Sequence, residues 1–146
     1  MQNPATFRLD DFLPYLLSVA ANAVSDAVSA TYSASHQLKT PEWRLIAVTA
    51  QDGALTPLAI GQRTRMDKVT VSRAAMALVE RGFLRRSPNP DDQRSHLLSL
   101  TPAGREVYDH VVPRALAIEA EIFADFSDEE RRVLAELLKK AQQAAR

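Results

Sequence analysis

The 146-residue sequence contains no cysteine, which excludes disulfides, thiolate nucleophiles, cysteine-based zinc sites and thiol redox sensors. With only four glycines, it has no glycine-rich phosphate loop, and no nucleophile motif occurs. Its three histidines are scattered without the paired spacing that a metal site needs. We therefore expect no metal, no cofactor and no enzymatic activity.

Long apolar runs are also missing. The most apolar segment, Phe12 to Val24, is followed by Asp26 and falls short of the ~18 residues of a membrane helix. Asp10 and Asp11 precede it, where a secretion signal requires positive charge. We expect a cytoplasmic protein with no membrane partner, which agrees with the lack of cysteine.

Charge is distributed unevenly along the chain, although the formal net charge is zero. Residues 61–96 carry eight Lys or Arg against four Asp or Glu, whereas each flanking segment has an acidic excess of about two. A basic centre between acidic ends indicates a polyanionic partner for the centre. The alternative is a solvated charged face, because a local excess of about four charges is common in folded domains.

Helix starts are marked by capping residues, several of them followed by proline. Asp11 and Thr40 are expected caps for the first two helices, and Pro113 is expected to kink the fifth. We predict helices over residues 11–36, 40–52, 56–63, 67–82 and 101–125, and a last helix from residue 127. Between the fourth and fifth helices, the pattern of residues 83–100 predicts a β-hairpin with a long polar tip.

This order predicts a mainly α (α+β) fold, a winged helix-turn-helix flanked by long terminal helices. On the helix that starts at Asp67, the ~100° step between residues separates two faces. The apolar face carries Val71, Ala74, Ala75 and Leu78, and the opposite face carries Val69, Thr70, Arg73, Met76 and Ala77, with Lys68 and Ser72 at its margins. Cations, hydroxyls and small apolar groups are what a DNA major groove accepts, whereas an ordinary amphipathic helix would more often expose Glu and Lys.

Gly61 interrupts the short preceding helix, where a glycine costs about 1 kcal/mol relative to alanine. We expect glycine to be required here because the helix that starts at Asp67, the recognition helix, approaches closely. The alternative explanation for the glycine is that a short helix simply frays.

The hairpin tip offers Asp92 and Arg94, and its first strand offers Arg85 and Arg86. An arginine at such a tip can enter the minor groove of double-stranded DNA while a neighbouring acid fixes its geometry. The alternative is an ordinary surface ion pair.

Together these residues resemble the MarR family of bacterial transcriptional regulators. The resemblance rests on Asp67–Arg73, Leu78–Arg86, and Asp92-Gln93-Arg94 followed by Leu98–Thr101 and Gly104. It implies a homodimer formed by residues 8–36 and 105–146, with residues 40–104 binding a pseudo-palindromic operator within one chain of residues 1–146. It also implies an effector that is a small aromatic or phenolic compound. Ile60-Gly61 departs from the Leu-Ala that is frequent in the family, and the lack of cysteine excludes its thiol-oxidation members.

Apolar stripes on the terminal helices support the dimer independently, because a small winged domain cannot cover them alone.

The resemblance places the effector near the end of the first helix, where Tyr32, His36, Trp43 and Arg44 occur. An aromatic wall with a cation suits a small anionic aromatic ligand, although such residues at a helix junction are more often core.

Three functions are compatible with these patterns: a dimeric DNA-binding regulator, most simply a repressor; a winged-helix module that binds protein; and a small helical enzyme. We favour the first, and the sequence lacks the catalytic constellation that an enzyme needs. A DNA mobility shift at several salt concentrations separates the first two functions, because a module that binds protein would show neither tight binding to one palindrome nor a steep loss of affinity with salt.

Overall fold

The computed structural model describes all residues from 1 to 146. Two short 3-10 helices precede six α-helices and one two-stranded sheet. The elements are η1 (Pro4–Thr6), η2 (Leu9–Asp11), α1 (Leu13–His36), α2 (Thr40–Asp52), α3 (Pro57–Thr64), α4 (Lys68–Glu80), β1 (Leu84–Pro88), β2 (His96–Leu100), α5 (Pro102–Ile122) and α6 (Asp128–Ala144). The predicted fold class and order of elements are confirmed.

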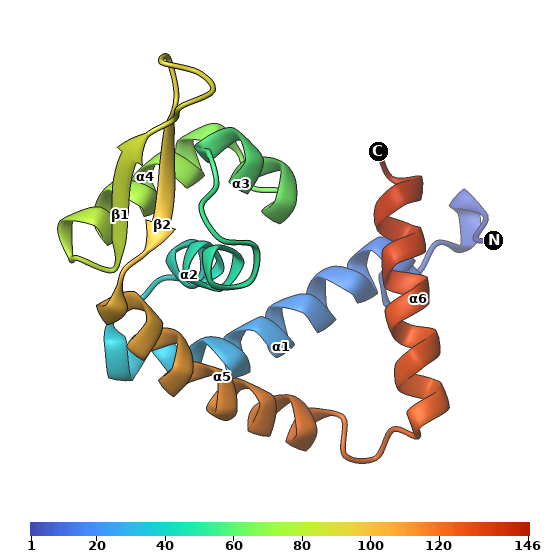
Figure 1. The fold of residues 1–146 in the computed structure, drawn as a ribbon. Coiled ribbons are helices and arrows are strands. Elements are labelled where there is room, and N and C mark those ends of the chain that lie inside the picture. The colour runs from blue at the N-terminus through green and yellow to red at the C-terminus, as the bar shows by residue number, and fades with distance from the viewer.

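The winged part, made of α2, α3, α4 and the β1–β2 hairpin, gathers on one side of the molecule (Figure 1). Helices α1 and α5 pack against each other below it, and α6 extends away from it. The hairpin tip projects beyond α3 and α4 (Figure 1). None of the helices is long and apolar enough to cross a membrane.

Four helices have a side-chain cap at the residue where the sequence predicted the helix to start. In each, a side-chain oxygen accepts a hydrogen bond from a backbone N–H of the first turn that has no partner within the helix. The caps are Thr56, Asp67, Thr101 and Ser127, which accept from the amides of Ala59, Thr70, Gly104 and Glu130.

The first two caps were predicted wrongly. Asp11 belongs to η2, where it pairs with Arg8, and α1 begins after Phe12 without a side-chain cap. Helix α2 has Lys39 at its N-cap, and the Glu42 carboxylate accepts from the Lys39 amide at 2.8 Å. The Thr40 hydroxyl lies 2.9 Å from the Tyr32 hydroxyl, so it serves the contact between helices.

Strands β1 and β2 pair antiparallel, from Leu84 opposite Leu100 to Pro88 opposite His96. The backbone of Leu55 adds a single bridge to Leu98, donating at 3.0 Å and accepting at 2.8 Å. The sequence did not predict this third segment, because one paired residue has no alternation to detect. It joins the chain between α2 and α3 to the wing, so the hairpin is anchored to the helices.

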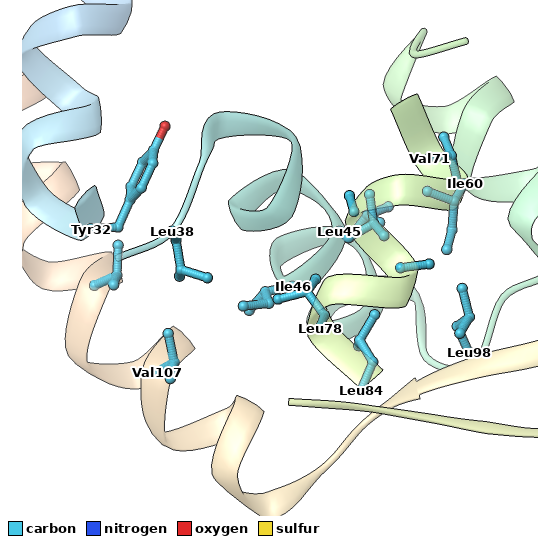
Figure 2. Packing of buried hydrophobic residues seen from close by; sticks show 14 residues of the cluster. Tyr32, Leu38, Leu45, Ile46, Ile60, Val71, Leu78, Leu84, Leu98 and Val107 are labelled. Carbon is cyan, nitrogen blue, oxygen red and sulfur yellow. The ribbon is translucent and has the colours of Figure 1, made fainter. Parts of the chain in front are cut away.

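The core lies within the winged part and extends to Tyr32 at the end of α1 and to Val107 and Val111 in the first half of α5 (Figure 2). Leu45 and Ile46 of α2, Ile60 of α3 and Leu78 of α4 are fully buried, and Leu98 closes the cluster from the wing. Burying one such side chain contributes roughly 1.5–3 kcal/mol, so this cluster fixes how α4 sits on α2 and α3.

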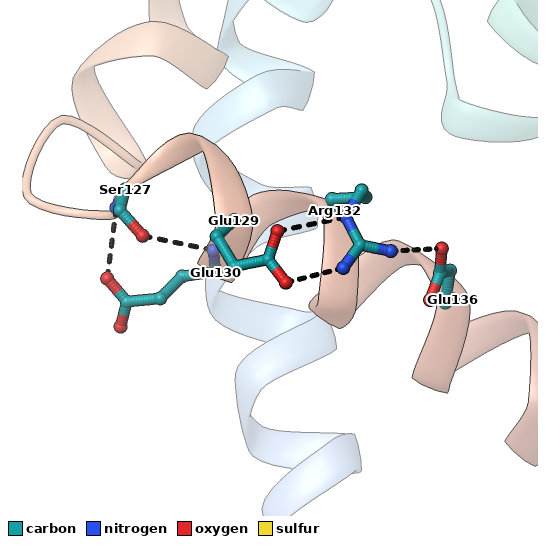
Figure 3. A network of polar contacts seen from close by, with 5 residues as sticks. All are labelled: Ser127, Glu129, Glu130, Arg132 and Glu136. Carbon is teal, nitrogen blue, oxygen red and sulfur yellow. Dashed lines mark hydrogen bonds and ion pairs between the residues drawn. The ribbon is translucent and has the colours of Figure 1, made fainter.

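Outside this core, burial is sparse. Helix α6 has no buried residue, and α1 buries only Thr31 and Tyr32 near its end. The start of α6 is held by polar contacts: the Ser127–Glu130 capping box, and Arg132 between Glu129 and Glu136 (Figure 3). These contacts are solvent-exposed and stabilise little. The flanking helices therefore keep large apolar side chains exposed.

Gly104 in the first turn of α5 is buried against the wing. A Cβ atom there would overlap the Phe83 carbonyl oxygen and lie 2.6 Å from Leu100 Cδ1. Backbone cannot move aside as a flexible side chain can, so only glycine fits.

We expect Gly104→Ala to lower the free energy of unfolding by about 1–3 kcal/mol, because the added methyl group overpacks the junction of wing and α5. Gly61→Ala is the matched control. Its Cβ would lie 3.2 Å from the Met66 carbonyl oxygen, and the better helix propensity offsets that tight contact. Urea unfolding of both variants measures the difference, and equal stabilities would contradict the packing argument.

Candidate nucleic-acid interface

Helix α4 presents the two faces that its sequence predicted. Val71, Ala74, Ala75 and Leu78 are at most 4% exposed and face the core. On the opposite face, Val69 is 58% and Met76 64% exposed, and Lys68, Ser72 and Arg73 are also exposed. An ordinary amphipathic helix would more often expose Glu and Lys at these positions.

The start of α4 is rigidly capped. The Asp67 carboxylate accepts from the Thr70 amide at 2.8 Å and from the Thr70 hydroxyl at 3.0 Å. The hydrogen bond from the Thr70 amide is the main cause that lowers the pKa of Asp67 below its usual value, and the hydrogen bond from the Thr70 hydroxyl adds to it. Thr70 is half-buried and its hydroxyl proton is engaged, so its hydroxyl is less available than the sequence suggested.

The turn between α3 and α4 forms a hollow of about 680 Å³. Gly61 is one of its lining residues, and a Cβ atom added at Gly61 would lie 3.2 Å from the Met66 carbonyl oxygen of the turn and at an ordinary 3.8 Å from Val71 of α4. The predicted close approach is therefore made mainly by the turn. Arg65, at the end of α3, adopts a left-handed conformation with φ of 62° and lines the hollow beside Lys68.

Two exposed residues of this surface were missed by the sequence reasoning. Leu58 is 73% exposed at the start of α3, and Arg65 stands at the turn. Arg65 carried a detectable signal, since it is a cation within the short turn between α3 and α4, whereas a single leucine in a short helix carries none.

The basic residues of the centre divide into two groups. Arg63 is paired with Asp52 at 3.1 Å, and Arg81 donates to backbone carbonyls of residues 36 and 37. The other six are exposed and form no ion pair: Arg65, Lys68, Arg73, Arg85, Arg86 and Arg94. Their charges remain available to an external anion, which is what a phosphate backbone requires.

The wing tip is shaped by Asp92, but differently from the prediction. Its carboxylate accepts from the Arg94 amide at 3.0 Å, and its carbonyl accepts from the Ser95 amide at 3.1 Å. No ion pair joins the Asp92 carboxylate to the Arg94 guanidinium. Asp92 fixes the turn of the backbone, and the arginine side chain is left free.

The four residues expected near an effector separate in the structure. Tyr32 stacks on Trp43 at 5.6 Å between ring centroids, and Trp43 stacks on Tyr108 of α5 at 5.9 Å. Beside Trp43 and Tyr108 lies a pocket of about 260 Å³, which Glu119 also lines. Arg44 is not among its lining residues; it lies beside Arg63 in another hollow.

His36 packs edge to face on His110 of α5, with 5.0 Å between ring centroids. Partial burial lowers the pKa of His36, and the positive charges of His110, Arg114 and Arg81 add to this effect. His36 is thus a junction residue between α1 and α5, apart from the aromatic stack.

Comparison with known proteins adds independent evidence. A family model described as the MarR family matches residues 36–95. The uncharacterized HTH-type transcriptional regulator YwoH of Bacillus subtilis is 26% identical over 102 residues, which cover 70% of this chain and 74% of the relative.

Two solved structures extend the likeness over nearly the whole chain. BpsR of Bordetella bronchiseptica, studied for the regulation of its DNA binding by 6-hydroxynicotinic acid, is 26% identical, with a TM-score of 0.86 over 93% of this chain and 96% of that protein. A MarR family transcriptional regulator from Silicibacter pomeroyi is 28% identical, with a TM-score of 0.82 over 99% and 97%. Residues 36–95 thus match the MarR family of transcriptional regulators, and the chain as a whole has the winged-helix fold of the solved MarR family regulator.

Proposed function

We propose that this protein is a cytoplasmic homodimeric repressor that binds a pseudo-palindromic operator in double-stranded DNA and is released by a small aromatic effector. The observation that carries the proposal is the exposed face of α4, where Arg73 stands free of any ion pair between exposed Val69 and Met76. BpsR, whose fold this chain shares, is a protein in which a small aromatic acid regulates DNA binding.

Arg73 is the residue best suited to read a base. It lies in the first half of α4, the part of a recognition helix that enters the major groove. A guanidinium can donate two parallel hydrogen bonds to the O6 and N7 atoms of guanine. Lys68, Ser72, Arg85 and Arg86 flank it as phosphate contacts, and Val69 can meet a thymine methyl group. Thr70 contributes less, because Asp67 engages its hydroxyl.

Dimerisation is supported by the exposed apolar side chains of the flanking helices. In the N-terminal part of the chain, Leu9, Leu13 and Leu17 are 43–70% exposed, and Leu137 and Leu138 of α6 are 55% and 45% exposed. A monomer would expose this surface to water at a cost of about 25 cal/mol per Å². We assign residues 8–36 and 105–146 to the dimer and residues 40–104 to DNA binding, so that each operator half meets one recognition helix.

The pocket beside Trp43 and Tyr108 is the proposed effector site. Two aromatic rings form one wall, and Val28, Val112, Ala115 and Leu116 supply apolar surface. Its ionisable group is Glu119 rather than Arg44, so the pocket favours an uncharged phenolic ring over the anionic ligand that the sequence suggested. Because α1, α2 and α5 all contribute, a ligand there would contact both the dimer helices and the winged part.

We expect Arg73→Ala to weaken cognate operator binding by about 1–3 kcal/mol per half-site and to relax selectivity at one symmetric base position. Mobility shifts against a set of operator variants measure both effects, and two chains should bind each operator. Arg132→Ala, which removes an exposed arginine from α6, is the matched control and should bind as wild type. An equal loss on cognate and random DNA would show that Arg73 contacts phosphate only.

The wing makes a separate prediction. Arg94→Ala should lower affinity for most sequences, flatten the preference for A·T-rich flanks and reduce the salt dependence of binding, because a minor-groove arginine senses groove width and potential. Asp92→Ala should cause the same changes in DNA binding to a smaller extent, because the wing tip loses the hydrogen bond between the Asp92 carboxylate and the Arg94 amide. Asp92→Asn retains an oxygen for the Arg94 amide and should bind at least as well as wild type. Unchanged binding by Arg94→Ala would mean that the wing does not touch DNA.

Trp43 is the sole tryptophan, so its fluorescence reports directly on the proposed effector pocket. Titration with phenol should quench or shift the emission more strongly than titration with benzoate, because Glu119 disfavours an anion. Ala115→Leu fills the pocket and should abolish the fluorescence response to both compounds. The absence of any response to either compound, or its persistence in Ala115→Leu, would place the effector elsewhere.

A further inference from the structure

Arg81 follows the last turn of α4 and reaches across to the end of α1. Its Nη2 atom donates to the His36 carbonyl oxygen at 2.6 Å and its Nη1 atom to the Gln37 carbonyl oxygen at 3.1 Å. The guanidinium also lies 4.9 Å from the centre of the Phe83 ring. Three contacts thus hold one exposed side chain in a defined position.

The two acceptors are chemically suited to this arginine. The last carbonyls of a helix have no intrahelical donor and carry the negative end of the helix dipole. Gln37 ends α1 in the left-handed conformation, with φ of 53°, which is uncommon for a residue other than glycine. A planar guanidinium can serve two neighbouring carbonyls at once, and a lysine ammonium cannot reproduce that fixed geometry.

No other side-chain hydrogen bond joins α4 or its cap to α1. We infer that Arg81 is a positioning residue, which fixes the recognition helix relative to the dimer helix α1 and so sets the operator half-site spacing that the dimer accepts. This inference rests on the proposed function. It also separates Arg81 from the six free cations, although all belong to the same basic stretch of sequence.

The DNA test uses operators whose half-sites are moved one base pair closer or further apart. Wild type should favour one spacing, and Arg81→Ala, which loses both hydrogen bonds to the end of α1, should reduce that preference by about tenfold. Arg81→Lys retains the charge and should recover the preference only in part. The salt dependence should stay unchanged in both variants, because no phosphate contact is lost.

A second test needs neither DNA nor a dimer. Since the chain lacks cysteine, Asn22→Cys on α1 and Met76→Cys on α4 give a unique pair of spin labels, and both positions are exposed. In labelled chain diluted with unlabelled protein, the distance distribution between the labels should broaden in Arg81→Ala and remain narrow in Arg132→Ala. Thermal unfolding of the same samples controls for a general loss of folding.

Unchanged spacing preference together with an unchanged distance distribution would overturn the inference. So would a loss in Arg81→Ala that is equal on all DNAs, restored by lysine and accompanied by a weaker salt dependence, since that describes a phosphate contact. If wild type binds no operator, the proposed function fails, and the label distances still decide whether Arg81 positions α4.

Discussion

The packing of small side chains on α4 against α2 and α3 is the constraint on which the remaining structure depends. Val71, Ala74 and Ala75 have little bulk, so α4 can approach its neighbours closely, and Leu78 completes the contact. Once this face is buried, the helix has no rotational freedom, and Arg73 must point outward. The same core that stabilises the domain therefore decides which residues DNA can meet.

Net charge alone describes the basic surface of residues 61–96 poorly, because arginine side chains in this segment have different structural roles. Arg63 neutralises Asp52 and Arg81 ties two helices, while Arg73 and Arg94 have no partner. Counting the basic residues of the centre overstates the charge offered to a polyanion. Geometry, and the distance to the nearest acceptor, separates cations that hold the fold from cations that can bind DNA.

Local signals made most of the fold predictable. Thr56, Asp67 and Ser127 cap their helices through atoms one turn away, so the sequence contains the whole interaction. Predictions failed where a distant partner decides. Thr40 was expected to cap α2, but its hydroxyl meets Tyr32 of α1 instead. The same limit applied to the site, since Arg44 is adjacent to Trp43 in sequence yet lines another hollow.

The joint between the winged part and the flanking helices is the structural element that a regulator of this design would have to use. The Tyr32, Trp43 and Tyr108 rings stack across it, the proposed effector pocket opens beside two of them, and Arg81 also spans it through its hydrogen bond to the His36 carbonyl. Few buried groups fix α1 elsewhere. A ligand that binds one arrangement of α1 and the winged part more tightly than another is therefore sufficient to shift α1 relative to the winged part. Under the proposed function, a ligand in the pocket and loss of the Arg81 contacts should therefore have the same effect. Both should change the separation of the two recognition helices in the dimer.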